Sequence, residues 1–205
     1  MHRVRQFMTS QALDVSVIIP FGDDEDVIGR AVKRLAEHLR ELGCSFELLL
    51  ADEDSRDNSH SLLGLLRGDI PELRLLVAPG RGRGIEIGAD SARGQVLWLL
   101  TPQAALQTLS PFGGAYRRVS TGDLDLMVVE GRYSVARRTQ VHGLLTGMRG
   151  GPGIHERLAK RASSKLKVER HGLAGGAVNR NDSPWARILE TGPLRVALGW
   201  IDSES

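Results

Sequence analysis

The sequence contains few cysteines and few aromatic residues, and both shortages narrow what the chain can be. Cys44 is the single cysteine in 205 residues, which excludes an internal disulfide and a cysteine metal cluster. Aromatic side chains make up 4% of the chain. The sequence therefore offers no stacking platform with interleaved basic residues, and nucleic acid is not an expected partner.

Long apolar runs are also lacking. The longest, such as 96–100, are far shorter than the roughly 20 residues that a membrane-spanning helix needs. Residues 1–13 form a basic arm without the continuous apolar core of a signal peptide. We therefore expect a cytoplasmic protein with no transmembrane segment and at most weak peripheral membrane association.

The net charge of +2 conceals an asymmetry between the two parts of the chain. Residues 131–205 carry 13 Lys/Arg against 6 Asp/Glu, and residues 1–130 carry 14 against 19. A basic second part suits a phosphate-bearing acceptor or an anionic membrane surface, and it equally suits an ordinary solvated face.

Short apolar segments alternate with helical patterns over the first hundred residues. The strands are predicted at 15–20, 46–51, 73–77 and 96–100, and the helices at 26–42, at 58–66 and in a short segment ending at Ala92. This alternation predicts parallel strands joined by crossover helices. The fold class is therefore α/β, a Rossmann-type three-layer α/β/α arrangement with a mostly parallel sheet.

Beyond Thr101 the pattern weakens. We expect a strand at 124–129, a mobile glycine-rich segment at 143–153 and an amphipathic helix at 154–167. Residues 194–201 are predicted to be a last strand or a helical turn.

The stretch 45–59, SFELLLADEDSRDNS, is the part of the chain most suggestive of a site. A predicted buried strand there ends in Asp52, Glu53, Asp54 and Ser55. The carboxyl ends of parallel strands are where ligands bind in open α/β sheets. Asp, Asn and Ser also favour turns and helix caps, so for each residue a capping role is left open.

Several sequence blocks together resemble family 2 glycosyltransferases with the GT-A fold, the group that includes polyprenyl-phosphate sugar transferases. The family block Pro-x-Tyr-Asn-Glu-Glu is similar to 20–25, where Pro20 and Glu25 match. The block Val-Asp-Asp-Gly-Ser-Thr-Asp is similar to 51–57, and Gly-x-x-x-Ala-x-Gly is met by Gly88, Ala92 and Gly94. The likeness covers roughly residues 14–103, with a weaker continuation to about 167. It implies a nucleotide-binding core at 14–130, and a basic acceptor-side region of the same domain at 131–205.

The resemblance implies roles for individual residues. Asp52 or Glu53 would accept the N–H of a nucleotide base, and Arg83, within a glycine-rich loop, would approach a diphosphate. The predicted nucleotide-binding residues are Pro20, Phe21, Glu25, Asp52, Glu53, Ser55 and Arg83. Further arginines that match phosphate oxygens are Arg81, Arg132, Arg137 and Arg138.

Glu156 is the predicted catalytic general base, by its position at the start of a helix that resembles the family's E-L-x-x-R pattern. It is equally well explained as a first-turn acid stabilised by the helix dipole. The neighbouring His155 is interpreted as a polar helix-start residue.

The family's metal motif, Asp-x-Asp, would fall on Thr101, Pro102 and Gln103, so both of its carboxylates are missing. Thr and Gln offer only neutral oxygens to a hard cation. The Asn that usually precedes Gly88 by two residues is Glu86. We therefore expect no metal site and no other cofactor, with a nucleotide sugar as the substrate.

Two functions follow from the resemblance. One is a glycosyltransferase that moves a sugar from a nucleotide diphosphate to an acceptor without the usual metal. The alternative is a non-catalytic relative that binds a nucleotide or a partner protein. A nucleotidyltransferase is disfavoured, because the first strand is followed by FGDDE and not by a glycine-rich loop. A dinucleotide-dependent dehydrogenase is excluded, because no G-x-G-x-x-G follows that strand.

Overall fold

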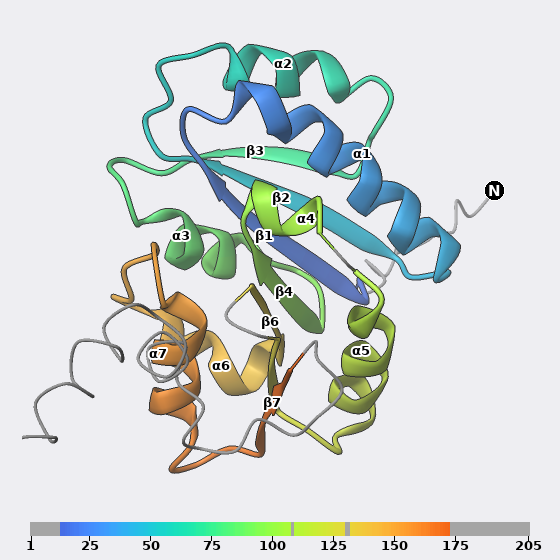
Figure 1. Ribbon diagram of the computed structural model, residues 1–205, viewed down its shortest axis with the longest axis vertical. Coiled ribbons are helices and arrows are strands. Elements are labelled where there is room, and N and C mark those ends of the chain that lie inside the picture. The colour runs from blue at the N-terminus through green and yellow to red at the C-terminus, as the bar shows by residue number, and fades with distance from the viewer. Residues whose placement is uncertain (1–12, 108, 130–131, 173–205) are drawn as a thin grey trace, which may run out of the picture.

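The computed structural model describes residues 13–107, 109–129 and 132–172 (Figure 1). Within these residues, seven strands form one sheet in the order β3-β2-β1-β4-β6-β5-β7. The strands are β1 (Val15–Phe21), β2 (Phe46–Asp52), β3 (Leu73–Val77), β4 (Val96–Leu100), β5 (Leu126–Val129), β6 (Tyr133–Arg137) and β7 (Val168–His171).

The first four strands are parallel, as the sequence predicts. β1 pairs with β2 and with β4, and β2 pairs with β3, each in parallel register. The chain thus runs outward from β1 to β3 and then returns to place β4 on the other side of β1. The connections leave the carboxyl ends of β1 and β4 in opposite directions, which creates the crevice where ligands bind in such sheets.

The other half of the sheet was largely missed by sequence analysis. β6 runs antiparallel to both β4 and β5, and β7 is parallel to β5. The strand predicted at 124–129 is β5, which begins two residues later. β6 and β7 escape prediction because neither is a continuous apolar run: β6 has the mixed sequence YSVAR and β7 has the polar sequence VERH.

Helices cover both faces of the sheet, which confirms the predicted three layers (Figure 1). One face carries α1 (Glu25–Glu41), α2 (Ser59–Leu66), α4 (Pro102–Ala105) and α5 (Pro111–Thr121). The other carries α3 (Gly84–Ser91), α6 (Arg138–Leu145) and α7 (Ile154–Ala162). Successive strand residues point to opposite faces, so Val17 and Ile19 join one core cluster while Ile18 joins the other.

Two predicted segments in the second half differ from the structure. The helix predicted at 154–167 ends at Ala162, and the chain then turns through Ser163 before β7. The glycine-rich segment predicted at 143–153 begins inside α6, which was not predicted. The element predicted at 194–201 lies outside the described residues.

The glycine spacing that carries part of the family resemblance has a packing cause. A Cβ atom at Gly88 would lie 2.3 Å from Ile18 Cγ2, and one at Gly94 would lie 2.4 Å from the Ser16 backbone nitrogen. α3 and the turn that follows it therefore lie against β1 with no room for a side chain at either position. This close approach fixes the amino end of α3 beside the crevice.

A buried carboxylate holds the opposite edge of the sheet together. Glu47, which is 1% exposed, accepts hydrogen bonds from Ser16 Oγ and the Arg93 backbone N–H, each at 2.7 Å, and also from Arg74. Burial by itself raises the pKa of Glu47, but these hydrogen bonds outweigh it and lower the pKa below its usual value. The ionised carboxylate thus fastens the starts of β1, β2 and β4.

Candidate functional site

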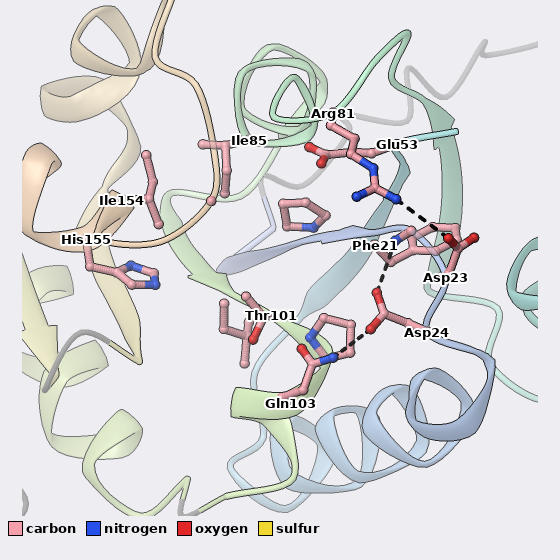
Figure 2. A pocket seen from close by; sticks show the side chains of 15 residues that line it. Phe21, Asp23, Asp24, Glu53, Arg81, Ile85, Thr101, Gln103, Ile154 and His155 are labelled. Carbon is pink, nitrogen blue, oxygen red and sulfur yellow. Dashed lines mark hydrogen bonds and ion pairs between the residues drawn. The ribbon is translucent and has the colours of Figure 1, made fainter. Parts of the chain in front are cut away.

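A cleft of about 390 Å³ opens at the carboxyl ends of β1 and β4 (Figure 2). It lies where the strand order reverses, in agreement with the general rule for parallel sheets. Its walls come from the β1–α1 loop, the start of α4, the loop before α3 and the start of α7. The side chains labelled in Figure 2 are Phe21, Asp23, Asp24, Glu53, Arg81, Ile85, Thr101, Gln103, Ile154 and His155.

Glu53 is the first carboxylate of the cleft, and both of its oxygens are engaged by backbone. Oε2 accepts a hydrogen bond from the Gly82 N–H and Oε1 accepts one from the Gly84 N–H, each at 2.8 Å. Because these amides precede and begin α3, the carboxylate occupies the electropositive end of that helix. A base-binding role for Glu53 would have to be shared with this capping role.

Asp23 and Asp24 are also engaged. Asp24 accepts hydrogen bonds from the Gly22 N–H at 3.0 Å and from Gln103 Nε2 at 2.6 Å. Asp23 accepts one from the Arg56 N–H at 2.7 Å and forms a long ion pair with Arg81 at 3.6 Å (Figure 2). The ionisable side chains that line the cleft are therefore three carboxylates, one arginine and His155.

Two further acids, Glu25 and Asp52, hold the strand-end loops by hydrogen bonds. Glu25 accepts a hydrogen bond from the Asn58 N–H at 2.8 Å. Asp52 accepts one from the Ser55 N–H at 2.8 Å and pairs with His60 Nδ1 at 2.9 Å. Glu25, Asp52 and Ser55 do not line the cleft, whereas Pro20, Phe21 and Glu53 do. Asp52 thus has the turn role that the sequence left open, and Glu25 links the two loops.

The predicted arginines are spread over the molecule. Arg81 lines the cleft, and its side chain is 81% exposed at the rim. Arg83 lies outside the lining and pairs with Glu86 at 3.3 Å. Arg137 and Arg138 lie at the amino end of β4, where Arg138 donates to the Gly94 carbonyl, so neither is near the cleft. Arg132 directly precedes β6 at the cleft end of the sheet.

Two glycine-rich loops meet at the rim of the cleft. The Gly150 N–H donates to the Gly82 carbonyl at 2.8 Å, and the Gly147 N–H donates to Glu86 at 2.7 Å. Arg157 on α7 donates to the carbonyls of Arg149 and Pro152. The segment between α6 and α7 is thereby attached to the loop that Glu53 holds.

The start of α7 places His155, not Glu156, in the cleft. His155 is 4% exposed, and its Nδ1 is hydrogen-bonded to Ser134 Oγ at 2.9 Å. Glu156 is exposed and pairs with Arg170 at 3.2 Å. The signal for His155 was present in the sequence, because it precedes Ala159 by four residues on the apolar side of the helix.

The residues at the end of β4 do not fit a divalent cation. Thr101 Oγ1 accepts a hydrogen bond from the Ala104 N–H at 3.3 Å and so caps α4. The side-chain amide of Gln103 turns its donor nitrogen toward Asp24. Within the described ranges, no group of three or more His, Cys, Asp or Glu side chains is arranged to hold a metal ion.

Comparison with known proteins identifies the fold. Neither a protein-family model nor a curated protein sequence matches the chain. In the structure, no helix of the described part is long and apolar enough to cross a membrane. Among solved structures, the mannosyltransferase PcManGT from Pyrobaculum calidifontis, in complex with GDP-Man and Mn²⁺, matches with a TM-score of 0.63 at 14% identity, over 96% of this chain and 66% of that one.

Two further structures agree with that match. TarS 1–349 from S. aureus, in complex with UDP, gives a TM-score of 0.57 at 13% identity, over 80% of this chain and 59% of that one. Glucosyl-3-phosphoglycerate synthase from Mycobacterium tuberculosis, with Mn²⁺, UDP and phosphoglyceric acid, gives 0.52 at 14% identity, over 78% and 68%. The chain spans just under two thirds of the first of these relatives, and it shares the fold of the GT-A glycosyltransferases.

The environment of His155 predicts how it titrates. Burial lowers the pKa of His155 to about 4; a hydrogen bond with the Arg132 backbone opposes the shift and the charge of Arg157 adds to it. An NMR titration of the imidazole should therefore show His155 neutral down to about pH 4, with its resonances assigned from their loss in His155→Gln.

The same shift affects stability. The unfolded chain binds a proton at His155 near pH 6.5 and the folded chain does not until about pH 4, so stability falls as pH falls through this window. The fall should be smaller in His155→Gln. A titration midpoint near the ordinary value would contradict the buried, neutral imidazole.

Proposed function

We propose that this chain binds a nucleotide sugar in the cleft and transfers the sugar to an acceptor without the usual divalent cation. The observation that carries the proposal is the end of β4, where Thr101 caps a helix and Gln103 is hydrogen-bonded to Asp24. Support for the nucleotide comes from the shared fold, since the similar structures hold GDP-Man or UDP. The proposed nucleotide contacts remain those predicted from the resemblance, and of these Pro20, Phe21 and Glu53 line the cleft.

Charge balance sets where a diphosphate can lie. The anion site that the start of α3 would offer is filled by the carboxylate of Glu53. Asp23 and Asp24 also repel an anion. A diphosphate is therefore best placed toward the rim, where the exposed guanidinium of Arg81 can reach it and can match two of its oxygens.

Arginine variants test this placement. Arg81→Ala should weaken binding of UDP or GDP by about 1.5–3 kcal/mol, the range for a hydrogen bond to a charged group, and should leave the bare nucleoside unaffected. Arg83→Ala is the matched control from the same loop, because Arg83 pairs with Glu86. Isothermal titration calorimetry with and without Mg²⁺ or Mn²⁺ measures both, and the cations should change the affinity little.

Other results of the same titrations would correct the proposal. A loss confined to Arg83→Ala would give that residue the diphosphate role predicted from the resemblance. Wild-type affinity that rises at least tenfold with Mn²⁺ would contradict a cation-independent site.

A second candidate is a non-catalytic relative that binds a nucleotide or a partner. It is favoured by the engagement of every carboxylate that lines the cleft and by the outward position of Glu156 beside Arg170. Turnover separates the two candidates. A transferase releases UDP or GDP from the donor sugar, whereas the second candidate binds the donor and leaves it intact.

The same assay tests the predicted general base. Glu156→Gln should retain turnover, because an exposed carboxylate paired with Arg170 does not face the cleft. A fall of about 100-fold or more, at unchanged donor affinity, would instead establish the general-base role predicted from the sequence. Arg170→Gln is the control for loss of the ion pair alone.

A further inference from the structure

The outer side of α7 and the turn after it gather exposed cations, which we call the α7 basic face. Its members are Arg157, Lys160, Arg161, Lys165 and Lys167, all of which are exposed. The chain has four lysines, and three of them lie between positions 160 and 167. The fold does not require this concentration of lysines and arginines, because α7 packs against the sheet through other residues.

The helical repeat accounts for this segregation. The buried residues of α7 are Ile154, His155, Leu158, Ala159 and Ala162. The positions between them, 156, 157, 160 and 161, form the opposite side of the helix. Figure 1 shows α7 at the periphery beside α6, on the far side of the molecule from α1 and α2. The apolar side of α7 is therefore used by the core, and the basic side faces outward.

Few acids offset the charge of this face; the nearest is Asp125, whose carboxylate accepts a hydrogen bond from the Lys167 backbone N–H at 3.0 Å. Residues 132–172 contain 10 Lys/Arg and 2 Asp/Glu. Both acids already have other partners, since Glu156 pairs with Arg170 and Glu169 pairs with Arg118. In the part of the chain that the structure describes, no side chain of the α7 basic face forms an ion pair with a carboxylate.

Two of the arginines are held in place without losing their charge. Arg157 Nη2 donates to the Arg149 carbonyl at 2.8 Å, and Arg161 Nη1 donates to the Leu144 carbonyl at 2.9 Å. Neutral carbonyls orient a guanidinium but leave its net charge intact. Arg157 and Arg161 therefore present their positive charges in fixed positions.

We propose that the α7 basic face docks the protein on a lipid bilayer that carries acidic headgroups. Several cations spread along one outward side match a plane of negative charge, and each Lys or Arg near such a surface contributes about 1 kcal/mol. Since the apolar side of α7 is buried in the protein, the attraction is electrostatic and does not include insertion into the acyl region. The docking is therefore reversible and sensitive to salt.

A nucleic acid is the main competing anion, and the described side chains do not favour it. Stacking of bases requires exposed aromatic rings. The aromatic side chains in the described part of the chain are all buried or half-buried: Phe21, Phe46, Trp98, Phe112, Tyr116 and Tyr133. The lack of exposed rings in this part of the chain thus disfavours a single strand, and a duplex, which is bound through its phosphates, is distinguished from the bilayer by the experiment below.

The α7 basic face and one wall of the cleft belong to the same helix. Ile154 and His155, at the start of α7, line the cleft, so a docked bilayer would lie on the same side of the sheet as that wall. The docking itself does not depend on the proposed function, because its charges lie outside the cleft. A failure of either proposal can therefore be recognised separately.

Co-sedimentation of the full chain with lipid vesicles tests the docking. Vesicles of phosphatidylcholine with about 30% phosphatidylserine should bind the protein, those of phosphatidylcholine alone should not, and about 0.5 M NaCl should release it. Lys160→Gln with Lys165→Gln should lower the partition coefficient about 30-fold, from about 5-fold for each charge. Among the described residues, neither lysine side chain forms a hydrogen bond or an ion pair, so the double variant should fold; circular dichroism checks this.

The matched control removes two cations elsewhere. Lys33→Gln with Arg34→Gln takes two exposed charges from α1 and should change the partition coefficient by less than about twofold. Equal loss in both double variants would show a general charge effect and overturn the proposal. Equal binding to uncharged vesicles, or tighter binding to a DNA duplex than to the acidic vesicles at the same salt, would overturn it as well.

Discussion

The cleft depends on the carboxylate of Glu53, which joins the end of β2 to the glycine-rich loop before α3. Its two oxygens accept the N–H groups of Gly82 and Gly84. A Cβ atom at Gly84 would lie 2.9 Å from Glu53 Oε1, so the contact requires glycine. With the loop held there, Arg81 reaches the rim and the Gly82 carbonyl accepts the Gly150 N–H from the α6–α7 segment. One carboxylate thus determines the position of two walls.

Because of this contact, a carboxylate of the protein occupies the positive end of α3. A helix start commonly receives a ligand's phosphate, but here it receives a side chain of the protein. At the end of β4, Thr101 caps α4 and Gln103 is hydrogen-bonded to Asp24, and neither side chain carries a charge. What is left to balance a diphosphate is arginine, and Arg81 is the arginine that lines the cleft. An exposed guanidinium can adjust its position on binding, whereas the engaged acids cannot move without losing their hydrogen bonds.

Sequence patterns were sufficient where a strand is a continuous apolar run. β1, β2 and β4 are continuous apolar runs, so their positions and parallel pairing were predictable. β7, with two charged residues in four, has no such signal, and its pairing with β5 depends on contacts distant in sequence. The predicted loops do flank the cleft. The hydrogen-bond partner of each acid was not predictable. Glu53, for example, accepts a hydrogen bond from a backbone N–H 29 residues away, and the sequence does not specify which amides approach it.

A crystal structure of the chain soaked with UDP or GDP and Mn²⁺ would show whether the cleft accepts a nucleotide diphosphate without a cation. We expect nucleotide density between the β1–α1 loop and Glu53, with the diphosphate beside Arg81. We also expect no anomalous manganese signal near Thr101 and Gln103. Manganese bridging the diphosphate to those residues, or a nucleotide bound elsewhere on the chain, would contradict a cation-independent cleft.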